Sequence, residues 1–129
     1  MIASHIAAVC AAALLVLLAV FQVLLAAGLP LGHAAWGGRH RGVLPPALRW
    51  ASLAAAGILC GAAWVALARA DLVAPGAEPL GISIATWCFA AYFSLNVAGN
   101  LLSQSTLERA VMTPVAALLA LCFITLAFS

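Results

Sequence analysis

Four stretches of the sequence are each long and apolar enough to cross a membrane as a helix, and together they occupy most of the chain. They run over about 6–28, 48–70, 80–102 and 106–128. A helix that crosses the ~30 Å hydrocarbon core of a bilayer needs about 20 mostly apolar residues. The runs are continuous and do not alternate with polar residues, as the strands of a membrane barrel would. The pattern predicts an all-α bundle of four transmembrane helices, forming one domain over 1–129.

The composition excludes most other classes of protein. Hydrophobic residues make up 67% of the chain and charged residues 6%. A soluble domain carries about 25% charged residues, and a chain of this length could not bury so much apolar surface in water. A soluble domain, a disordered chain and a basic nucleic-acid-binding protein are therefore excluded. The first stretch is too long for a signal peptide and no basic residue precedes it, so we expect it to be a mature helix.

The start of the fourth helix has its own signals. Ser105-Thr106-Leu107-Glu108 reads as a capping box, in which Ser105 caps the helix and the Glu108 side chain reaches back to the cap. The helix should then begin at Thr106. Pro114 lies inside it and removes one backbone hydrogen bond, so we expect a kink there that frees the carbonyl near Ala110.

The arginines predict the orientation of the bundle. With four spans, the first loop (about 28–46) and the third loop lie on one side of the membrane, and both termini lie on the other. The side of the two loops carries Arg39, Arg41, Arg49 and Arg109, with His33 and His40. The opposite side carries only Arg69, beside Asp71 and Glu78. Because arginine is retained on the cytoplasmic side, we expect a multi-pass protein of the bacterial inner membrane with both termini extracytoplasmic.

One face of the third helix is polar. Tyr92, Asn96, Asn100 and Ser103 follow helical spacing, and Gln22 in the first helix lies at a similar depth. Polar groups in hydrocarbon are costly unless they are bonded, so this face should point into the bundle. Either these amides bond one another and hold the bundle together, or they line a small polar cavity that opens to the cytoplasm.

The first loop is the most site-like segment. It combines several glycines and prolines with Trp36, histidines and arginines. Its arginines could hold the phosphates of anionic lipids, or one of Arg39, Arg41 and Arg49 could pair with Glu108 of the third loop and join the two hairpins. The candidate polar or lipid-facing site comprises His33, Trp36, Arg39, His40, Arg41, Arg49, Asn96, Asn100, Ser103, Glu108 and Arg109.

Two segments carry a resemblance to known sequences. They are GLPLGHAAWGGRHRGVLPPALRWAS, over 28–52, and N-x-x-S-x-S-x-x-E-R-x-x-x-x-P-V-A, over 100–116. They resemble a group of small uncharacterised four-span bacterial membrane proteins. The matching positions are Gly28, Pro30, Gly32, Gly37, Gly38, Leu44, Pro45, Arg49, Asn100, Ser105, Glu108, Arg109, Pro114 and Val115. The resemblance implies a four-span topology with the first and third loops on one face, and it implies no reaction.

A glycine pair on the second helix suggests close helix packing. Gly57 and Gly61 form a GxxxG motif, which lets two helix backbones approach closely. The pair could pack against the first or third helix of the same chain. It could also form the seam of a homodimer.

The functional expectation is non-enzymatic. No nucleophile, base or metal-ligand set is arranged in the sequence, no cofactor motif occurs, and the four cysteines lie inside the spans without a C-x-x-C spacing. We expect a small structural, accessory or lipid-contacting membrane protein, alone, as a homodimer or in a larger membrane complex. The alternative is a dimeric small-molecule transporter of the small multidrug type. Proton-coupled export normally needs an acidic residue within a helix, and Asp71, Glu78 and Glu108 are all placed at interfaces by the sequence.

Overall fold

Four long helices build the structure, a computed structural model that describes residues 1–77 and 79–129. They are α1 (Ile2–Ala27), α2 (Pro46–Arg69), α3 (Pro79–Leu101), and a fourth helix in which a π-helical segment, η3 (Glu108–Met112), leads into α4 (Thr113–Ala127). Each of the four is long and apolar enough to cross a membrane. The predicted all-α, four-helix membrane bundle is confirmed, and the chain is a multi-pass membrane protein.

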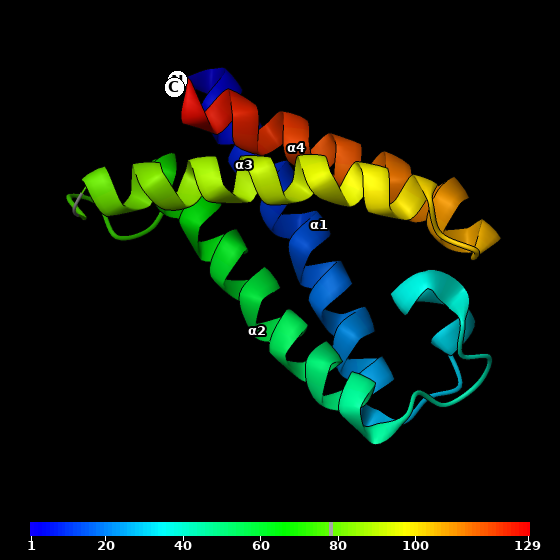
Figure 1. The fold of residues 1–129 in the computed structure, drawn as a ribbon. Helices are drawn as coiled ribbons and strands as arrows, with labels where there is room; N and C mark the ends of the chain where they lie inside the picture. The colour runs from blue at the N-terminus through cyan, green and yellow to red at the C-terminus, as the bar shows by residue number, and fades with distance from the viewer. Residues whose placement is uncertain (78) are drawn as a thin grey trace.

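The helices form two hairpins that cross one another. Helices α1 and α2 pair along their length, as do α3 and α4 (Figure 1). The hairpins meet at the end of the bundle that holds both termini and diverge toward the other end (Figure 1). The core lies where they meet, and much of it is alanine: Ala8, Ala11, Ala62 and Ala66 are fully buried. Small side chains let membrane helices approach closely, and van der Waals contact then holds them together.

Aromatic side chains pack between α3 and α4, inside the second hairpin. Phe89 and Phe93 of α3 lie against Phe123 of α4, with ring centroids 5.5 and 5.4 Å from its centroid. Phe123 is fully buried.

The first loop, residues 28–45, occupies the space between the diverging hairpins (Figure 1). It begins at Gly28, which caps α1, and contains two short 3₁₀ turns, η1 (Gly32–Ala34) and η2 (Trp36–Gly38). Buried Ala35 and Leu44 pack with Leu25 of α1 in a second apolar cluster. This cluster anchors the loop to the first hairpin, so the loop is part of the packed structure.

The start of the fourth helix confirms one half of the predicted capping box. The chain turns helical at Thr106, and the backbone N–H of Glu108 donates to Ser105 Oγ at 3.2 Å. The other half of the prediction, in which the Glu108 side chain reaches back to Ser105, was wrong. The N–H of Ser105 donates to Ser103 Oγ at 3.0 Å, which leaves the Glu108 carboxylate free to reach elsewhere.

Pro114 disturbs the fourth helix in a specific way. A proline has no N–H for the carbonyl four residues earlier, and the five residues before Thr113 take up the wider π turn. The N–H of Thr113 accordingly bonds the carbonyl of Glu108. The irregularity expected at Pro114 therefore takes the form of a π-helical segment. Such segments occur frequently at functional sites.

The glycine pair of α2 lies on the outside of the chain. Gly57 and Gly61 are exposed, and a Cβ atom built on either would meet no atom of the described chain within 4 Å. The interpretation that they pack against the first or third helix was wrong. They face away from the core alanines of α2, so a homodimer seam stays a prediction.

Candidate functional site

A cavity of about 250 Å³ lies where the two hairpins begin to diverge, beneath the first loop. All four long helices and the first loop contribute to its wall. Its lining residues are Leu18, Phe21, Gln22, Ala34, Ala35, Trp36, Ala55, Leu59, Tyr92, Phe93, Asn96, Asn100, Glu108, Met112, Val115, Ala116 and Leu119. The wall is apolar with a few polar groups, as is usual for a small-molecule site.

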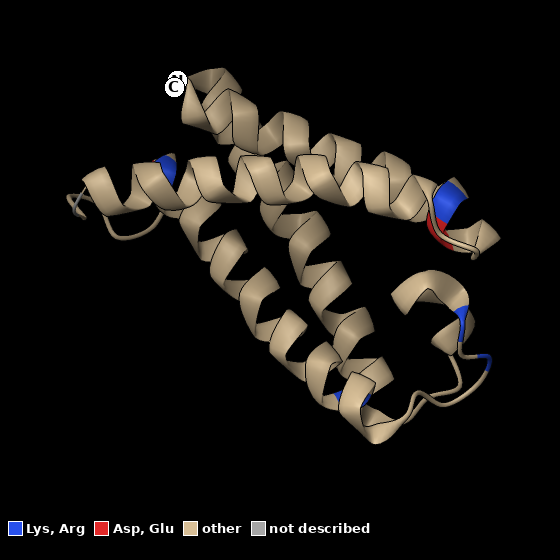
Figure 2. Cartoon of the chain, in the orientation of Figure 1, with Lys and Arg blue, Asp and Glu red and all other residues tan. Residues whose placement is uncertain are grey.

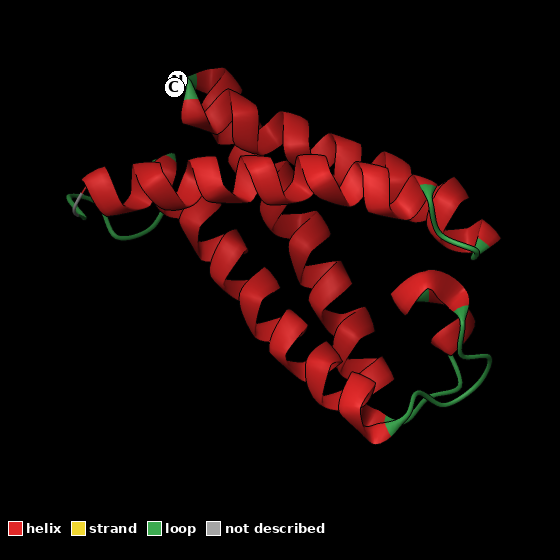
Figure 3. Ribbon diagram, in the orientation of Figure 1, coloured by secondary structure: helices red, strands yellow, loops and turns green. Residues whose placement is uncertain are grey.

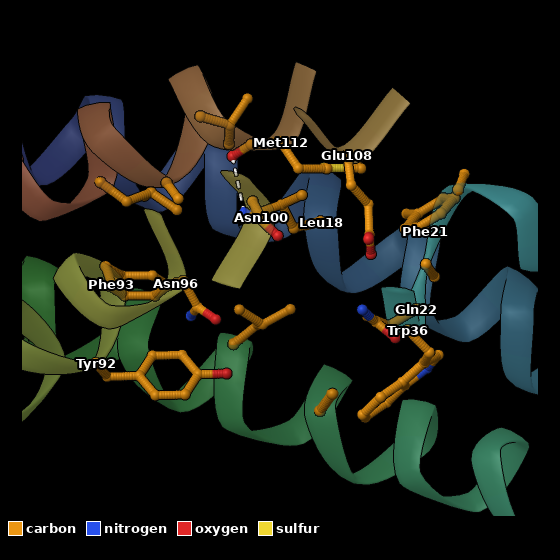
Figure 4. A pocket seen from close by; sticks show the side chains of 17 residues that line it. Leu18, Phe21, Gln22, Trp36, Tyr92, Phe93, Asn96, Asn100, Glu108 and Met112 are labelled. Atoms are coloured by element: carbon orange, nitrogen blue, oxygen red, sulfur yellow. Dashed lines mark hydrogen bonds between the residues drawn. The ribbon is translucent and has the colours of Figure 1, made fainter. Parts of the chain in front are cut away.

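The polar face of α3 lines this cavity. Figure 4 shows Tyr92 and Asn96 directed into the same space as Gln22 of α1. Asn100 donates through Nδ2 to the carbonyl of Met112 at 3.2 Å. Gln22 Oε1 is buried and accepts no hydrogen bond from the described part of the chain. The amides therefore do not bond one another, and the arrangement favours the cavity interpretation over mutual bonding.

Glu108 is the acidic group of the cavity, and it is only 8% exposed. One carboxylate oxygen accepts the hydroxyl of Ser103, and the other accepts the backbone N–H of Gly37 at 3.4 Å. The predicted pairing of Glu108 with Arg39, Arg41 or Arg49 was wrong. Its partners are a hydroxyl and a backbone amide, and its side chain is buried in the cavity wall.

Hydrogen bonds join the first loop to both hairpins. Ser105 Oγ donates to the carbonyl of His33 at 2.6 Å, and Trp36 Nε1 donates to Oγ of the fully buried Ser52 on α2 at 2.9 Å. With the contact between Gly37 and Glu108, these bonds bring the first and third loops together at one end of the molecule. The shared face that the sequence predicts for the two loops is present in the structure.

The four arginines at this end have two different roles. Arg49 Nε donates to the carbonyl of Ala26 at 2.9 Å, and Arg109 Nη1 donates to the carbonyl of Ser103 at 2.6 Å. Arg49 therefore bonds the last turn of α1, and Arg109 bonds the third loop just after α3. Arg39 and Arg41 are exposed, and neither makes a hydrogen bond or an ion pair with the described residues. Figure 2 shows these basic positions gathered at the open end of the hairpins.

A second hollow, of about 630 Å³, lies on the surface at this end. It is lined by His33, Gly38, Arg41, Gln104, Ser105, Thr106, Leu107 and Ala110. The fourth helix begins here, so the positive end of its dipole faces the hollow beside Arg41. The hollow thus has the chemistry to receive an anionic group.

The candidate residues divide into three groups. Trp36, Asn96, Asn100 and Glu108 line the cavity, supported by Ser103. His33, Arg39, His40 and Arg41 lie exposed on the first loop. Arg49 and Arg109 bind backbone carbonyls. Glu78 lies outside the described residues.

Sequence reasoning missed Ser52 and the backbone of Gly37. The signal for Ser52 was a lone hydroxyl among the alanines of α2. Gly37 carried no signal, because it acts through a backbone N–H.

The fold and the cavity define a class, the small four-helix multi-pass membrane proteins with a polar cavity inside the bundle. No family model matches the sequence, and neither a curated protein nor a solved structure matches it.

Proposed function

We propose that the protein is a non-enzymatic membrane protein that contacts anionic lipid headgroups through the end formed by its first and third loops. The observation that carries this proposal is the pair of exposed arginines, Arg39 and Arg41. Arg41 lines a hollow that the start of the fourth helix also lines. A basic residue near an anionic leaflet contributes about 1 kcal/mol of attraction. Because Arg39 and Arg41 are not engaged within the described chain, their charge is available to a phosphate.

The same distribution of charge supports an orientation. Four of the five arginines lie at the end of the first and third loops, and Arg69 lies at the end of the termini. By the retention of arginine on the cytoplasmic side, the two loops face the cytoplasm and both termini face outward.

A non-enzymatic role is favoured by the composition of the cavity wall. Glu108 is the one acid among its described lining residues, and no histidine or cysteine accompanies it. Its carboxylate is held by Ser103 and Gly37. A general base needs a reacting group within hydrogen-bond reach and an orienting partner. The other functional groups of the described cavity wall are amides and aromatic rings, which do not act as acids or bases.

The lipid proposal is tested by removing the two free charges. Purified protein in neutral detergent is titrated with phosphatidylglycerol and phosphatidylcholine, and lipid retention is read by native mass spectrometry. Wild type should retain phosphatidylglycerol preferentially. The double variant Arg39→Gln/Arg41→Gln should lose about 30-fold in that affinity, which corresponds to about 1 kcal/mol for each arginine.

The control for this test is Arg69→Gln at the opposite end, where Arg69 donates to the carbonyl of Ser129. Its affinity for phosphatidylglycerol should match that of wild type. Equal retention by the double variant and wild type would reject headgroup recognition by the first loop.

A small-molecule transporter is the second candidate, and the position of Glu108 favours it. The sequence places this acid at an interface, whereas the structure buries it in the cavity between the hairpins. Ionisable residues inside membrane bundles mark proton and substrate pathways. Substrate-dependent proton flux in proteoliposomes tests this candidate, with Glu108→Gln expected to abolish the flux. A panel of amphiphilic substrates that produced no flux would count against transport.

A further inference from the structure

We propose that the cavity binds a small protonated amine with an apolar body, and that its ammonium group lies between the Glu108 carboxylate and the Gln22 side-chain oxygen. The proposal stands apart from the lipid contact, which uses residues on the surface. It also holds whether or not the amine crosses the membrane.

The charge of the cavity wall is not balanced within the described chain. Glu108 is buried, and its partners, Ser103 and Gly37, are neutral. No arginine or histidine among the described residues forms an ion pair with it. A buried charge is normally paired with an opposite charge, since leaving it alone in a low dielectric is costly. Within the described part of the chain, the cavity therefore has a carboxyl group with no ion-pair partner.

The cavity wall also contains a hydrogen-bond acceptor without a donor in the described chain. Gln22 Oε1 is buried in the cavity wall and accepts no hydrogen bond from the described chain. Buried acceptors are rarely left without a donor. Figure 4 shows the Gln22 side chain and the Glu108 carboxylate reaching into the same space from α1 and from η3. One ligand group that is both positive and a hydrogen-bond donor satisfies both residues, and an ammonium group has these properties.

The rest of the cavity wall is largely aromatic and aliphatic. Phe21, Trp36, Tyr92 and Phe93 supply four aromatic rings, with Leu18 beside them. Aromatic faces attract cations, most strongly when water is excluded, and they pack against an apolar body. At about 250 Å³, the cavity is slightly smaller than the usual ligand site of about 300–1,000 Å³. It suits an amine with a single ring or a short chain.

The ligand also has a route into the cavity. Two of its lining residues, Trp36 and Tyr92, are 41% and 45% exposed, so the cavity reaches the surface of the bundle. Amphipathic aromatic residues favour the boundary between headgroups and hydrocarbon. An amphiphilic amine accumulates in the same layer.

The test uses three probes that share a phenylethyl group and measures their affinity for the protein in neutral detergent by calorimetry. They are 2-phenylethylamine, its neutral analogue 2-phenylethanol, and its N,N,N-trimethyl derivative, which keeps the charge but has no N–H. The amine should bind at least tenfold more tightly than either analogue. No binding of the amine, or equal binding of amine and alcohol, would overturn the proposal, since a cavity that only holds water or apolar groups would not distinguish them.

Two variants assign the ammonium contacts. Glu108→Gln should weaken amine binding at least tenfold and leave alcohol binding unchanged. Gln22→Leu should reduce the preference for the amine over its trimethyl derivative to twofold or less. If Glu108→Gln fails to fold, the Gln22 variant still tests the proposal, because the oxygen that it removes accepts no hydrogen bond from the described chain.

Gln104→Leu is the matched control, since it removes an exposed amide outside this cavity. It should bind all three probes as wild type does. A folded Glu108→Gln or Gln22→Leu protein with the wild-type affinity and preference would overturn the assignment. A protein that binds the amine but produces no proton flux would reject transport and retain the binding site.

Discussion

Gly38 lies close against Ser105, where the first loop meets the third loop. A Cβ atom added to it would lie 2.7 Å from the Cβ of Ser105 and 3.0 Å from that residue's backbone. Ser105 cannot move away easily, because its hydroxyl both accepts from Glu108 and donates to His33. The absence of a side chain at this position therefore allows the first loop to dock onto the start of the fourth helix.

Comparing Gly38→Ala with Gly42→Ala tests this contact. Both glycines have positive φ angles, of 71° and 102°, but a Cβ at Gly42 meets open space. Gly42→Ala should lower the free energy of unfolding by about 1 kcal/mol through backbone strain. Gly38→Ala adds overpacking and should lower it by about 2–4 kcal/mol. Thermal melting in detergent measures both, and equal losses would show that Gly38 does not hold the loops together.

At the scale of the element, α2 has two contrasting faces. Its buried face carries Ala62 and Ala66, which let α1 approach closely, whereas Gly57 and Gly61 lie on an exposed face. The sequence alone could not show whether the glycines or the alanines of α2 face a neighbouring helix, because both residue types permit close packing. The side of the helix that receives a neighbour depends on where the other helices lie.

Substitutions on the two faces of α2 should have opposite effects. Gly57→Ala and Gly61→Ala should leave the melting temperature of the detergent-solubilised monomer unchanged or raise it, since alanine favours the helix by about 1 kcal/mol and meets no atom there. Ala62→Leu should destabilise the protein by about 1–3 kcal/mol through overpacking, since Ala62 is fully buried. If the glycine variants destabilise the monomer as much as Ala62→Leu does, then Gly57 and Gly61 pack against other helices of the same chain, and their exposed placement is contradicted.

At the scale of the whole molecule, the crossing hairpins separate two ends with different chemistry. Both termini lie together, and Arg69 of α2 donates to the carbonyl of Ser129 at 2.7 Å (Figure 1). The opposite end holds the first and third loops and the two hollows. Figure 3 shows that the first loop contains much of the non-helical chain, and it lies where the hairpins diverge. The divergence leaves room for the cavity, and the loop covers it.

The two ends should label from opposite sides of the membrane. Single cysteines at the exposed positions His40 and Gln104 belong to the loop end, and Ser129→Cys marks the other. With the native cysteines replaced, an impermeant maleimide should reach Ser129→Cys in right-side-out vesicles, and His40→Cys and Gln104→Cys only after permeabilisation. Labelling of the two loops from different faces would contradict the fold, whereas inverted labelling of both ends would reverse only the orientation.

The sequence by itself determined the four spans, the segregation of arginine to one end and the polarity of one face of α3. These properties follow from local composition and helical spacing, because a bilayer requires continuous apolar runs and makes each unpaired polar group costly. The tertiary structure decided the rest: which arginines are free, that Glu108 turns inward to Ser103 and Gly37, and that Gln22 is left without a donor. Those outcomes depend on the crossing of the hairpins and on the π segment before Pro114, which bring together groups far apart in the chain.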